Sequence, residues 1–236
     1  MAMCSSLTSC SKKKGRVMSD IYNLIIGEKN YSSWSMRAWL ALRLVETPFT
    51  MTDVSVYRPE SRQLVQSLGG ETGMVPVLRR GSTVIWDTLA IIEFLDERHR
   101  GLWPKAEADR ALARSYACEV HSGMTALRSA MPVNTRGRDR MATIDTEVSE
   151  DILRVQSLFE RSAGTKTGWM FQSFGAVDII FSAIATRFQT YGVDLSAEAT
   201  AYMERLLEHP LVKEWLAFGV SEDSRIDQFE LPHRAQ

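Results

Sequence analysis

The sequence has few cysteines, and their positions do not suggest a framework. Three occur in 236 residues, at Cys4, Cys10 and Cys118, and their spacing matches no metal-binding motif. The sequence therefore supports neither a disulfide framework nor a zinc site. We expect a reducing compartment, the cytoplasm, and no metal cofactor.

Long apolar runs and an excess of charge of one sign are also missing. No stretch approaches the roughly 20 apolar residues that span a bilayer, and Met1 to Val17 lacks the apolar centre of a secretory signal. Lys and Arg total 28 against 29 for Asp and Glu, so the whole chain has no field that attracts nucleic acid or an anionic membrane. The 44% hydrophobic share is ample for packed cores. We expect a soluble protein with neither nucleic acid nor a membrane as partner.

The first 20 residues differ in composition from the rest of the chain. They are rich in Ser and Lys, contain the run Lys12-Lys13-Lys14 and have no acid before Asp20. Nothing in this segment could bury itself, so residues 1–20 are interpreted as a disordered tail. A targeting segment is the alternative.

From residue 21 to residue 101 the apolar pattern alternates between strand and helix periods. Ile21 to Ile26 is a short apolar run typical of a buried strand, and Ala38, Ala41, Leu42 and Val45 then recur at helical spacing. Further strands are predicted at Phe49–Val56, Val75–Leu78 and Thr83–Trp86, and further helices at Gln63–Leu68 and Leu89–Arg98. The order βαβαββα predicts a small mixed α/β sheet with helices packed on it.

After Gly101 to Pro104 the pattern is helical. The clearest helix places Val177, Ile180, Phe181, Ile184 and Phe188 on one face. A later helix is expected to end at His209-Pro210, because a proline restricts the residue before it. We therefore predict a sheet-containing domain at residues 21–101 and an all-helical domain at residues 106–236.

Serine hydroxyls gather at the predicted start of the first helix. The turn reads Asn30-Tyr31-Ser32-Ser33-Trp34-Ser35-Met36-Arg37. A helix start offers N–H groups without internal partners and attracts anions. One serine would serve as the N-cap, and three serines exceed what capping needs.

Two further clusters suit an amino-acid-like ligand. Pro76 interrupts a predicted strand, so it lies either at an ordinary sheet edge or in a cis bond that leaves the Val75 N–H and C=O free for a peptide-like ligand. At the next helix start, Asp87 could receive an ammonium group and Thr88 could hold a carboxylate. The alternative for Thr88 is a plain N-cap.

These clusters, in this order, resemble the N-terminal domain of glutathione transferases, most closely the zeta class and related bacterial enzymes. The stretch Ser32 to Arg37 is similar to the zeta class Ser-Ser-Cys-Ser-X-Arg turn. Val75-Pro76 and Asp87 to Leu95 resemble the family's Val-Pro and Glu/Gln-Ser-X-Ala-Ile segments, and Gly175 to Asp178 resembles its helix capping box. The resemblance covers about Ile21 to Phe218. It implies a thioredoxin-like first domain, a helical second domain, a homodimer and a cytoplasmic role in detoxification.

The resemblance implies that Ser32 stabilises the glutathione thiolate, with Ser33 as second candidate. The implied glutathione-binding residues are Val75, Pro76, Asp87 and Thr88. Lowering a thiol pKa of about 8.5 by two units requires about 2.7 kcal/mol. A charge-assisted hydrogen bond of about 1.5 to 3 kcal/mol, with the helix dipole, could supply this. The expected activity is conjugation of glutathione to an apolar electrophile, or reduction of a peroxide.

The electrophile pocket is expected along the first long helix of the second domain. Its candidates are Trp34, Tyr116, His121, Met124 and Arg128. No acid or nucleophile is evident beside His121, so a structural role is expected for it, whereas Arg128 could hold an anionic substrate or form a surface salt bridge. Two alternatives are a non-catalytic glutathione-fold binding protein and a maleylacetoacetate-type isomerase. The second is disfavoured because Trp34 stands where the zeta class has its cysteine.

Overall fold

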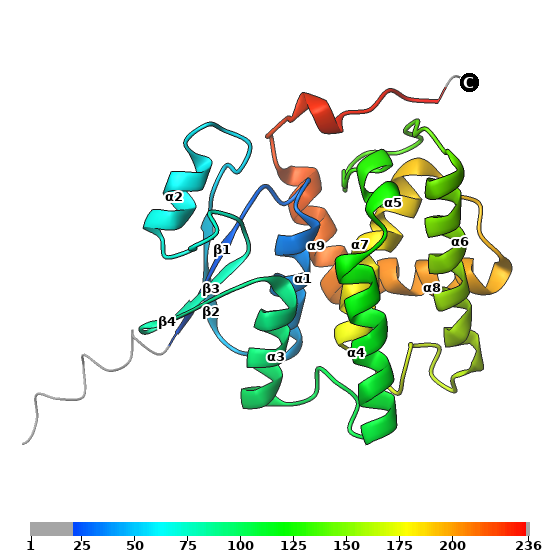
Figure 1. Ribbon diagram of the computed structural model, residues 1–236, viewed down its shortest axis with the longest axis horizontal. Helices are drawn as coiled ribbons and strands as arrows, with labels where there is room; N and C mark the ends of the chain where they lie inside the picture. The colour runs from blue at the N-terminus through cyan, green and yellow to red at the C-terminus, as the bar shows by residue number, and fades with distance from the viewer. Residues whose placement is uncertain (1–20, 235–236) are drawn as a thin grey trace, which may run out of the picture.

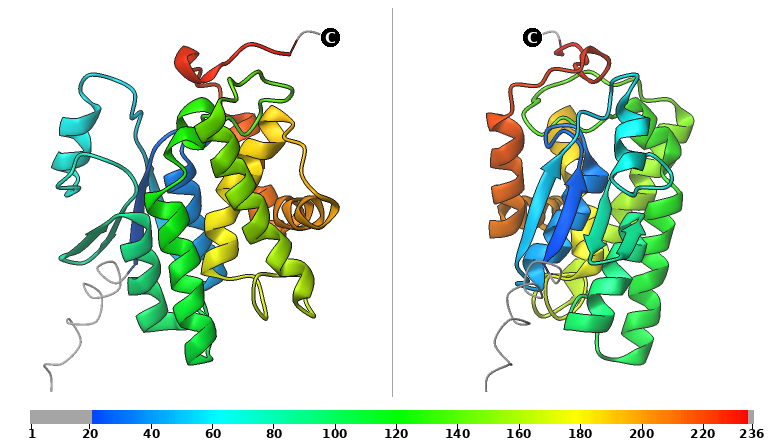
Figure 2. Two further views of the ribbon diagram at one scale, coloured as in Figure 1. Left: turned by 45° about the vertical axis from the view of Figure 1, so that its right-hand side comes forward. Right: turned by 90° about the vertical axis from the view of Figure 1, so that its left-hand side faces the viewer.

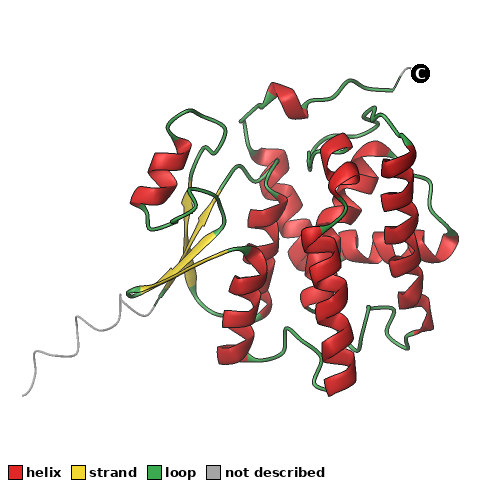
Figure 3. Cartoon of the chain, in the orientation of Figure 1, coloured by secondary structure: helices red, strands yellow, loops and turns green. Residues whose placement is uncertain are grey.

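A computed structural model describes residues 21–234 as a four-stranded sheet with helices, followed by a group of helices (Figure 1). The predicted tail, residues 1–20, lies outside the described residues, and so do Cys4 and Cys10. The first part comprises β1 (Tyr22–Ile26), α1 (Ser33–Leu44), β2 (Phe49–Asp53), α2 (Ser61–Ser67), β3 (Val77–Arg80), β4 (Thr83–Trp86) and α3 (Thr88–His99). The second comprises α4 (Glu107–Ser122), α5 (Thr125–Ala130), α6 (Thr146–Glu160), α7 (Ala176–Tyr191), α8 (Ala197–Glu208) and α9 (Pro210–Ser221), with short 3-10 turns at Arg161–Gly164 and Asp227–Phe229. The predicted fold class, a thioredoxin-like βαβαββα part and a helical part, is confirmed (Figure 3).

The sheet separates two apolar clusters. Its strand order is β2-β1-β3-β4, with β1 parallel to β2 and the other pairs antiparallel. Because side chains alternate along a strand, Leu24 and Ile26 of β1 join the main core, whereas Ile25 packs in a smaller cluster with Val65 of α2. Helices α1 and α3 therefore cover the sheet face toward the second domain, and α2 covers the other face (Figure 2).

The third strand begins two residues later than the sequence predicts. Pro76 has no N–H to contribute to the ladder, so β3 starts after it, at Val77. At the other end, Arg79 and Arg80 pair with β4 and leave only Gly81 and Ser82 as the turn. The second strand is also shorter than expected and ends at Asp53 instead of Val56.

Helix α7 is the centre of the second domain. Its predicted apolar face is buried, and so are all its other residues except Gln189. A helix that is buried all round must be surrounded by neighbours, and here α4, α8 and α1 pack against it. Among the described residues, no helix is both long enough and apolar enough to cross a membrane.

The carboxylate of Asp178 holds the start of α7. It accepts hydrogen bonds from the N–H groups of Gly175 (3.0 Å) and Met170 (3.1 Å) and from the Tyr202 hydroxyl (2.6 Å). Gly175 has no side chain to return the bond, as expected from the sequence. Burial raises the pKa of Asp178 to about 6, although these hydrogen bonds act to lower it.

We expect Asp178 to make the stability fall as pH rises through the mildly acidic range. Its folded-state pKa of about 6 lies above the unfolded value of about 3.9, so the folded protein binds the extra proton between these values. The contribution of Asp178 to the unfolding free energy therefore decreases from about pH 4 to about pH 6, by at most about 3 kcal/mol. Urea unfolding of the parent and of Asp178→Asn across this range measures the effect. A difference between the two proteins that does not change with pH would contradict it.

The second domain fixes the turn that precedes α1. The Asn30 side chain is fully buried, and its oxygen accepts hydrogen bonds from the Thr135 hydroxyl (2.8 Å) and the Arg136 N–H (3.1 Å). Its amide donates to Asn134 Oδ1 at 3.1 Å. Because buried polar groups of this kind are costly to leave unpaired, the start of α1 cannot move independently of residues 134–136.

Gly219 of α9 lies too close to this network to carry a side chain. A Cβ there would lie 2.0 Å from Thr135 Oγ1 and 3.1 Å from Asn30 Cα. Alanine is normally favoured over glycine in a helix by about 1 kcal/mol, but overpacking should make Gly219→Ala destabilising by about 1 to 3 kcal/mol. Chemical unfolding of Gly219→Ala, Thr135→Ala and the double variant should show a smaller cost once the hydroxyl is gone. An equal cost in both backgrounds would rule out this explanation.

Candidate functional site

A pocket of about 480 Å³ opens where the start of α3, the approach to β3 and the end of α4 meet. It is lined by Trp34, Thr72, Met74, Val75, Pro76, Trp86, Asp87, Thr88 and His121. Six of these were predicted from the sequence as site residues: Trp34, Val75, Pro76, Asp87, Thr88 and His121. Thr72, Met74 and Trp86 were missed, although their nearness along the chain to predicted residues was a usable signal. Ser32, Ser33, Tyr116, Met124 and Arg128 do not line this pocket.

The backbone of Val75 is available on the pocket wall. The Val75-Pro76 peptide is cis, one of the two forms that the sequence allowed. No hydrogen bond between described residues engages the Val75 N–H or C=O, because the ladder of β3 begins only at Val77. An extended peptide-like ligand could pair with these two groups as an added strand would.

Asp87 has an unfavourable backbone conformation and fixed carboxylate oxygens. Its φ is 72°, a region that costs a non-glycine residue about 1 to 3 kcal/mol and is often found at functional sites. Its Oδ1 accepts hydrogen bonds from the N–H groups of Leu89 (2.8 Å) and Ala90 (3.3 Å), which makes Asp87 the N-cap of α3. The alternative of a cap at Thr88 is therefore wrong.

The charge of Asp87 is maintained by its neighbours. Burial acts to raise the pKa of this carboxyl, but the hydrogen bond and charge of His121 and the two N–H donors outweigh it and hold the pKa below its usual value. The carboxylate is therefore anionic at neutral pH. Next to it, Thr88 is buried and its hydroxyl donates to the Trp34 C=O at 3.4 Å.

His121 has an acid beside it, contrary to the expectation from the sequence. Its Nε2 lies 2.9 Å from Asp87 Oδ2, and its ring packs edge-on against Trp34 with 5.0 Å between ring centroids. Helix α4 of the second domain thus closes the pocket over the first domain. This pairing joins residues far apart in the chain, so no local pattern could have shown it.

The two candidate serines have different partners. Ser32 is the N-cap of α1, and its Oγ accepts a hydrogen bond from the Ser35 N–H (3.2 Å) and donates to Ser35 Oγ (2.8 Å). Ser33 is the first helical residue, and its Oγ accepts a hydrogen bond from Arg187 Nη2 at 3.4 Å. Within residues 21–234 the Ser33 hydroxyl has no acceptor for its own proton. The capping role thus belongs to Ser32, and Ser33 retains a donor for a ligand.

The remaining candidates for the electrophile pocket lie in different surroundings. Tyr116 is buried against Arg161, which lies 5.5 Å from its ring centroid, and Met124 is buried in the main core. Arg128 lies 5.5 Å from the ring centroid of Trp34 and donates to the His121 C=O at 3.0 Å. Of these three residues, only Arg128 contacts the pocket lining in this way.

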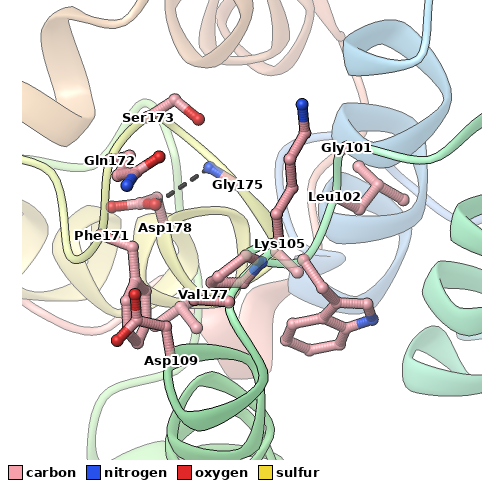
Figure 4. Close-up of a pocket in the computed structure, with 14 residues that line it drawn as sticks. Gly101, Leu102, Lys105, Asp109, Phe171, Gln172, Ser173, Gly175, Val177 and Asp178 are labelled. Atoms are coloured by element: carbon pink, nitrogen blue, oxygen red, sulfur yellow. Dashed lines mark hydrogen bonds between the residues drawn. The ribbon is translucent and has the colours of Figure 1, made fainter.

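A second hollow, of about 560 Å³, lies at the connection between the domains (Figure 4). Its wall includes Leu102, Lys105, Asp109 and Gln172, together with Asp178, whose carboxylate is already bound to the Gly175 N–H. None of the predicted site residues lines it. No group of three or more His, Cys, Asp or Glu side chains that could hold a metal occurs in the described part of the chain.

Comparisons with known proteins identify the first domain. Residues 31–98 match the family model described as the glutathione S-transferase N-terminal domain. The fold is similar to a glutathione transferase homolog from Burkholderia with bound glutathione, at 18% identity and a TM-score of 0.63, over 86% of this chain and 100% of that one. It is also similar to a theta class enzyme from Xanthomonas axonopodis pv. citri with glutathione bound (20% identity, TM-score 0.60, 84% and 97% covered). A third similar structure is a glutathione S-transferase from the Antarctic clam Laternula elliptica (16% identity, TM-score 0.67, 87% and 96% covered). A search of curated proteins found no match.

The matched segment contains the three clusters that suggested the family. It begins just before Ser32 and includes Val75-Pro76 and Asp87-Thr88. The similar structures come from several classes, so the particular resemblance to the zeta class stays a prediction. The described residues thus have the two-domain fold of glutathione transferases of several classes, and residues 31–98 match the model of their N-terminal domain.

Proposed function

We propose that this protein binds glutathione in the pocket beside Asp87 and stabilises the glutathione thiolate with a serine hydroxyl at the start of α1. The thiolate then attacks an electrophile or a peroxide. The observation that carries the proposal is that one pocket combines the unengaged Val75 backbone with the anionic, conformationally unfavourable Asp87. Two solved structures with the same fold hold glutathione, which supports this choice of ligand.

Three groups of glutathione match three residues of the pocket. Its α-ammonium would pair with Asp87, and its γ-glutamyl carboxylate would bind at Thr88, where the start of α3 favours negative charge. Its cysteinyl backbone would pair with Val75. This placement leaves the sulfur to be directed toward the start of α1.

The contacts at the start of α1 favour Ser33 over Ser32 as the thiol-activating residue. The Ser32 hydroxyl donates its hydrogen bond to Ser35 Oγ. The Ser33 hydroxyl donates to no described residue and accepts a hydrogen bond from the Arg187 guanidinium. In conjugation, the thiol proton leaves to solvent, a carbon–sulfur bond forms and the leaving group departs. With a hydroperoxide, the thiolate would attack the terminal oxygen and break the O–O bond, giving an alcohol after protonation and a sulfenic acid on glutathione. A second glutathione would then displace water from the sulfenic acid to form glutathione disulfide.

Binding and turnover together test the proposal. We expect calorimetry to detect glutathione binding at millimolar concentration or below, and we expect the protein to accelerate the reaction of glutathione with chlorodinitrobenzene or cumene hydroperoxide. Absence of binding would contradict the proposal. Binding without turnover across a broad panel of electrophiles would favour the alternative, a non-catalytic glutathione-binding protein.

Two finer expectations are tested separately. Maleylacetoacetate isomerase activity should be nearly absent, because Trp34 stands where the zeta class turn has its cysteine. An assay with that substrate decides this. Light scattering measures the molecular mass in solution and so tests the expected homodimer. A mass equal to that of one chain would contradict it.

A further inference from the structure

Three arginines gather beside the start of α1, and none of them pairs with a carboxylate of the described residues. Arg37 lies on α1, Arg128 on α5 and Arg187 on α7. Their charges act on one another, since Arg128 and Arg187 both lower the pKa of Arg37. None of the ion pairs among residues 21–234 includes any of the three.

Arg187 is well supplied with hydrogen-bond acceptors, whereas Arg37 is not. Arg187 donates to the backbone C=O groups of Met131 (2.9 Å) and Ala183 (3.0 Å) and to Ser33. Arg37 donates only its Nε, to the Ile180 C=O at 3.2 Å. Among residues 21–234 its two terminal nitrogens have no hydrogen-bond partner, although the residue is only 1% exposed. A buried cation with free donors is strongly unfavourable unless an anion or another acceptor completes it.

The acids whose charges act on Arg37 and Arg128 form their hydrogen bonds with other groups. Asp87 has one oxygen on His121 and the other on two N–H groups, and Asp151 accepts a hydrogen bond from the Leu127 N–H. Burial, followed by the charges of the other two arginines, lowers the pKa of Arg37 only to about 9. Arg37 is therefore still charged at neutral pH.

The arginines lie between the proposed thiol position and the pocket wall. At one end, Arg187 contacts the Ser33 hydroxyl. At the other, the guanidinium carbons of Arg37 and Arg128 lie 4.9 Å and 5.5 Å from the ring centroid of Trp34, and Trp34 itself lines the pocket. Trp34 therefore contacts both cations and the pocket, and a ligand in the pocket would meet this indole before the arginines.

We infer that Arg37 and Arg128 bind a carboxylate carried by the electrophile, so that this protein prefers carboxylate-bearing electrophiles to purely apolar ones. The inference rests on the proposed function, because it extends the same site. A guanidinium suits a carboxylate because its planar N–H groups can form two parallel hydrogen bonds to it. The apolar part of the electrophile would lie against Trp34, with its reacting carbon toward Ser33.

Paired glutathione thioethers test the inference without any need for turnover. S-benzylglutathione and S-(para-carboxybenzyl)glutathione differ only in the carboxylate. The parent protein should bind the carboxylate compound more tightly by about 10-fold or more, as expected for a charge-assisted hydrogen bond. In Arg128→Gln, whose side chain is partly exposed, this ratio should fall toward one. Arg205→Gln, which removes an exposed arginine of α8, should retain the ratio of the parent. Arg37→Gln provides a second test of the ratio, with thermal unfolding as the check on its fold.

The outcomes separate this inference from the function on which it rests. If S-benzylglutathione binds and the carboxylate gives no advantage in the parent, the carboxylate site is wrong and the glutathione site stands. The same holds if the advantage survives in both Arg128→Gln and Arg37→Gln. If neither thioether binds to the parent, the glutathione site is wrong and this inference falls with it.

Discussion

Ser33→Ala should raise the pKa of the bound glutathione thiol by about one to two units and lower turnover at neutral pH by about 10- to 100-fold. The hydroxyl would donate a charge-assisted hydrogen bond to the thiolate, worth about 1.5 to 3 kcal/mol, and one pKa unit corresponds to about 1.36 kcal/mol. Ultraviolet absorbance of the thiolate in the glutathione complex, followed against pH, measures the pKa directly. Turnover of chlorodinitrobenzene over the same pH range should show the loss shrinking at high pH, where glutathione is ionised in any case.

Ser32→Ala is the matched control, because it removes a hydroxyl one position away. It deletes the N-cap of α1, so it should destabilise the protein by about 1 kcal/mol and shift the thiol pKa much less. If Ser32→Ala carries the pKa shift and Ser33→Ala does not, the assignment of the two serines is reversed. If neither variant changes the pKa, serine activation of the thiol is wrong.

The parts of this molecule that the sequence predicted are those set by local chemistry. The strand β4 and the fold order follow from apolar periodicity, and the end of α8 follows from Pro210, which then begins α9. Six of the nine residues that line the pocket beside Asp87 were predicted for the same reason. Val75-Pro76 and Asp87-Thr88 mark an interrupted strand and a helix start, which are features of neighbouring residues.

Tertiary pairing accounts for what the sequence did not show. Nothing in the sequence around His121 or Asp87 indicates that the two side chains pair. Their contact exists because the end of α4 runs past the start of α3. In the same way, the contact of Arg187 with Ser33 depends on α7 packing against α1. The first contact helps to hold the pKa of Asp87 below its usual value, and the second gives Ser33 Oγ a hydrogen-bond donor. The sequence therefore predicted most of the pocket residues but did not show which contacts the second domain makes with them.

Asp87→Asn should weaken glutathione binding by about 10- to 100-fold, because it removes the charge that would hold the ligand's ammonium group. Asparagine tolerates positive φ and caps helices about as well as aspartate, so the unfolding free energy should change by less than about 1 kcal/mol. Calorimetry with glutathione and with its analogue lacking the α-amino group measures the effect. The parent should prefer glutathione, and the variant should bind the two compounds with similar affinity.

The charge state and the control make this test specific. Because the pKa of Asp87 lies below its usual value, the preference for glutathione should persist as pH falls to about 4 and weaken only when the carboxyl becomes protonated. Glu97→Gln, an equal loss of charge at an exposed position near the end of α3, should leave binding unchanged. If Asp87→Asn still distinguishes glutathione from its desamino analogue as the parent does, the ammonium group is recognised elsewhere. Since the Val75 backbone offers no charge, the placement of glutathione in this pocket would then have to be revised.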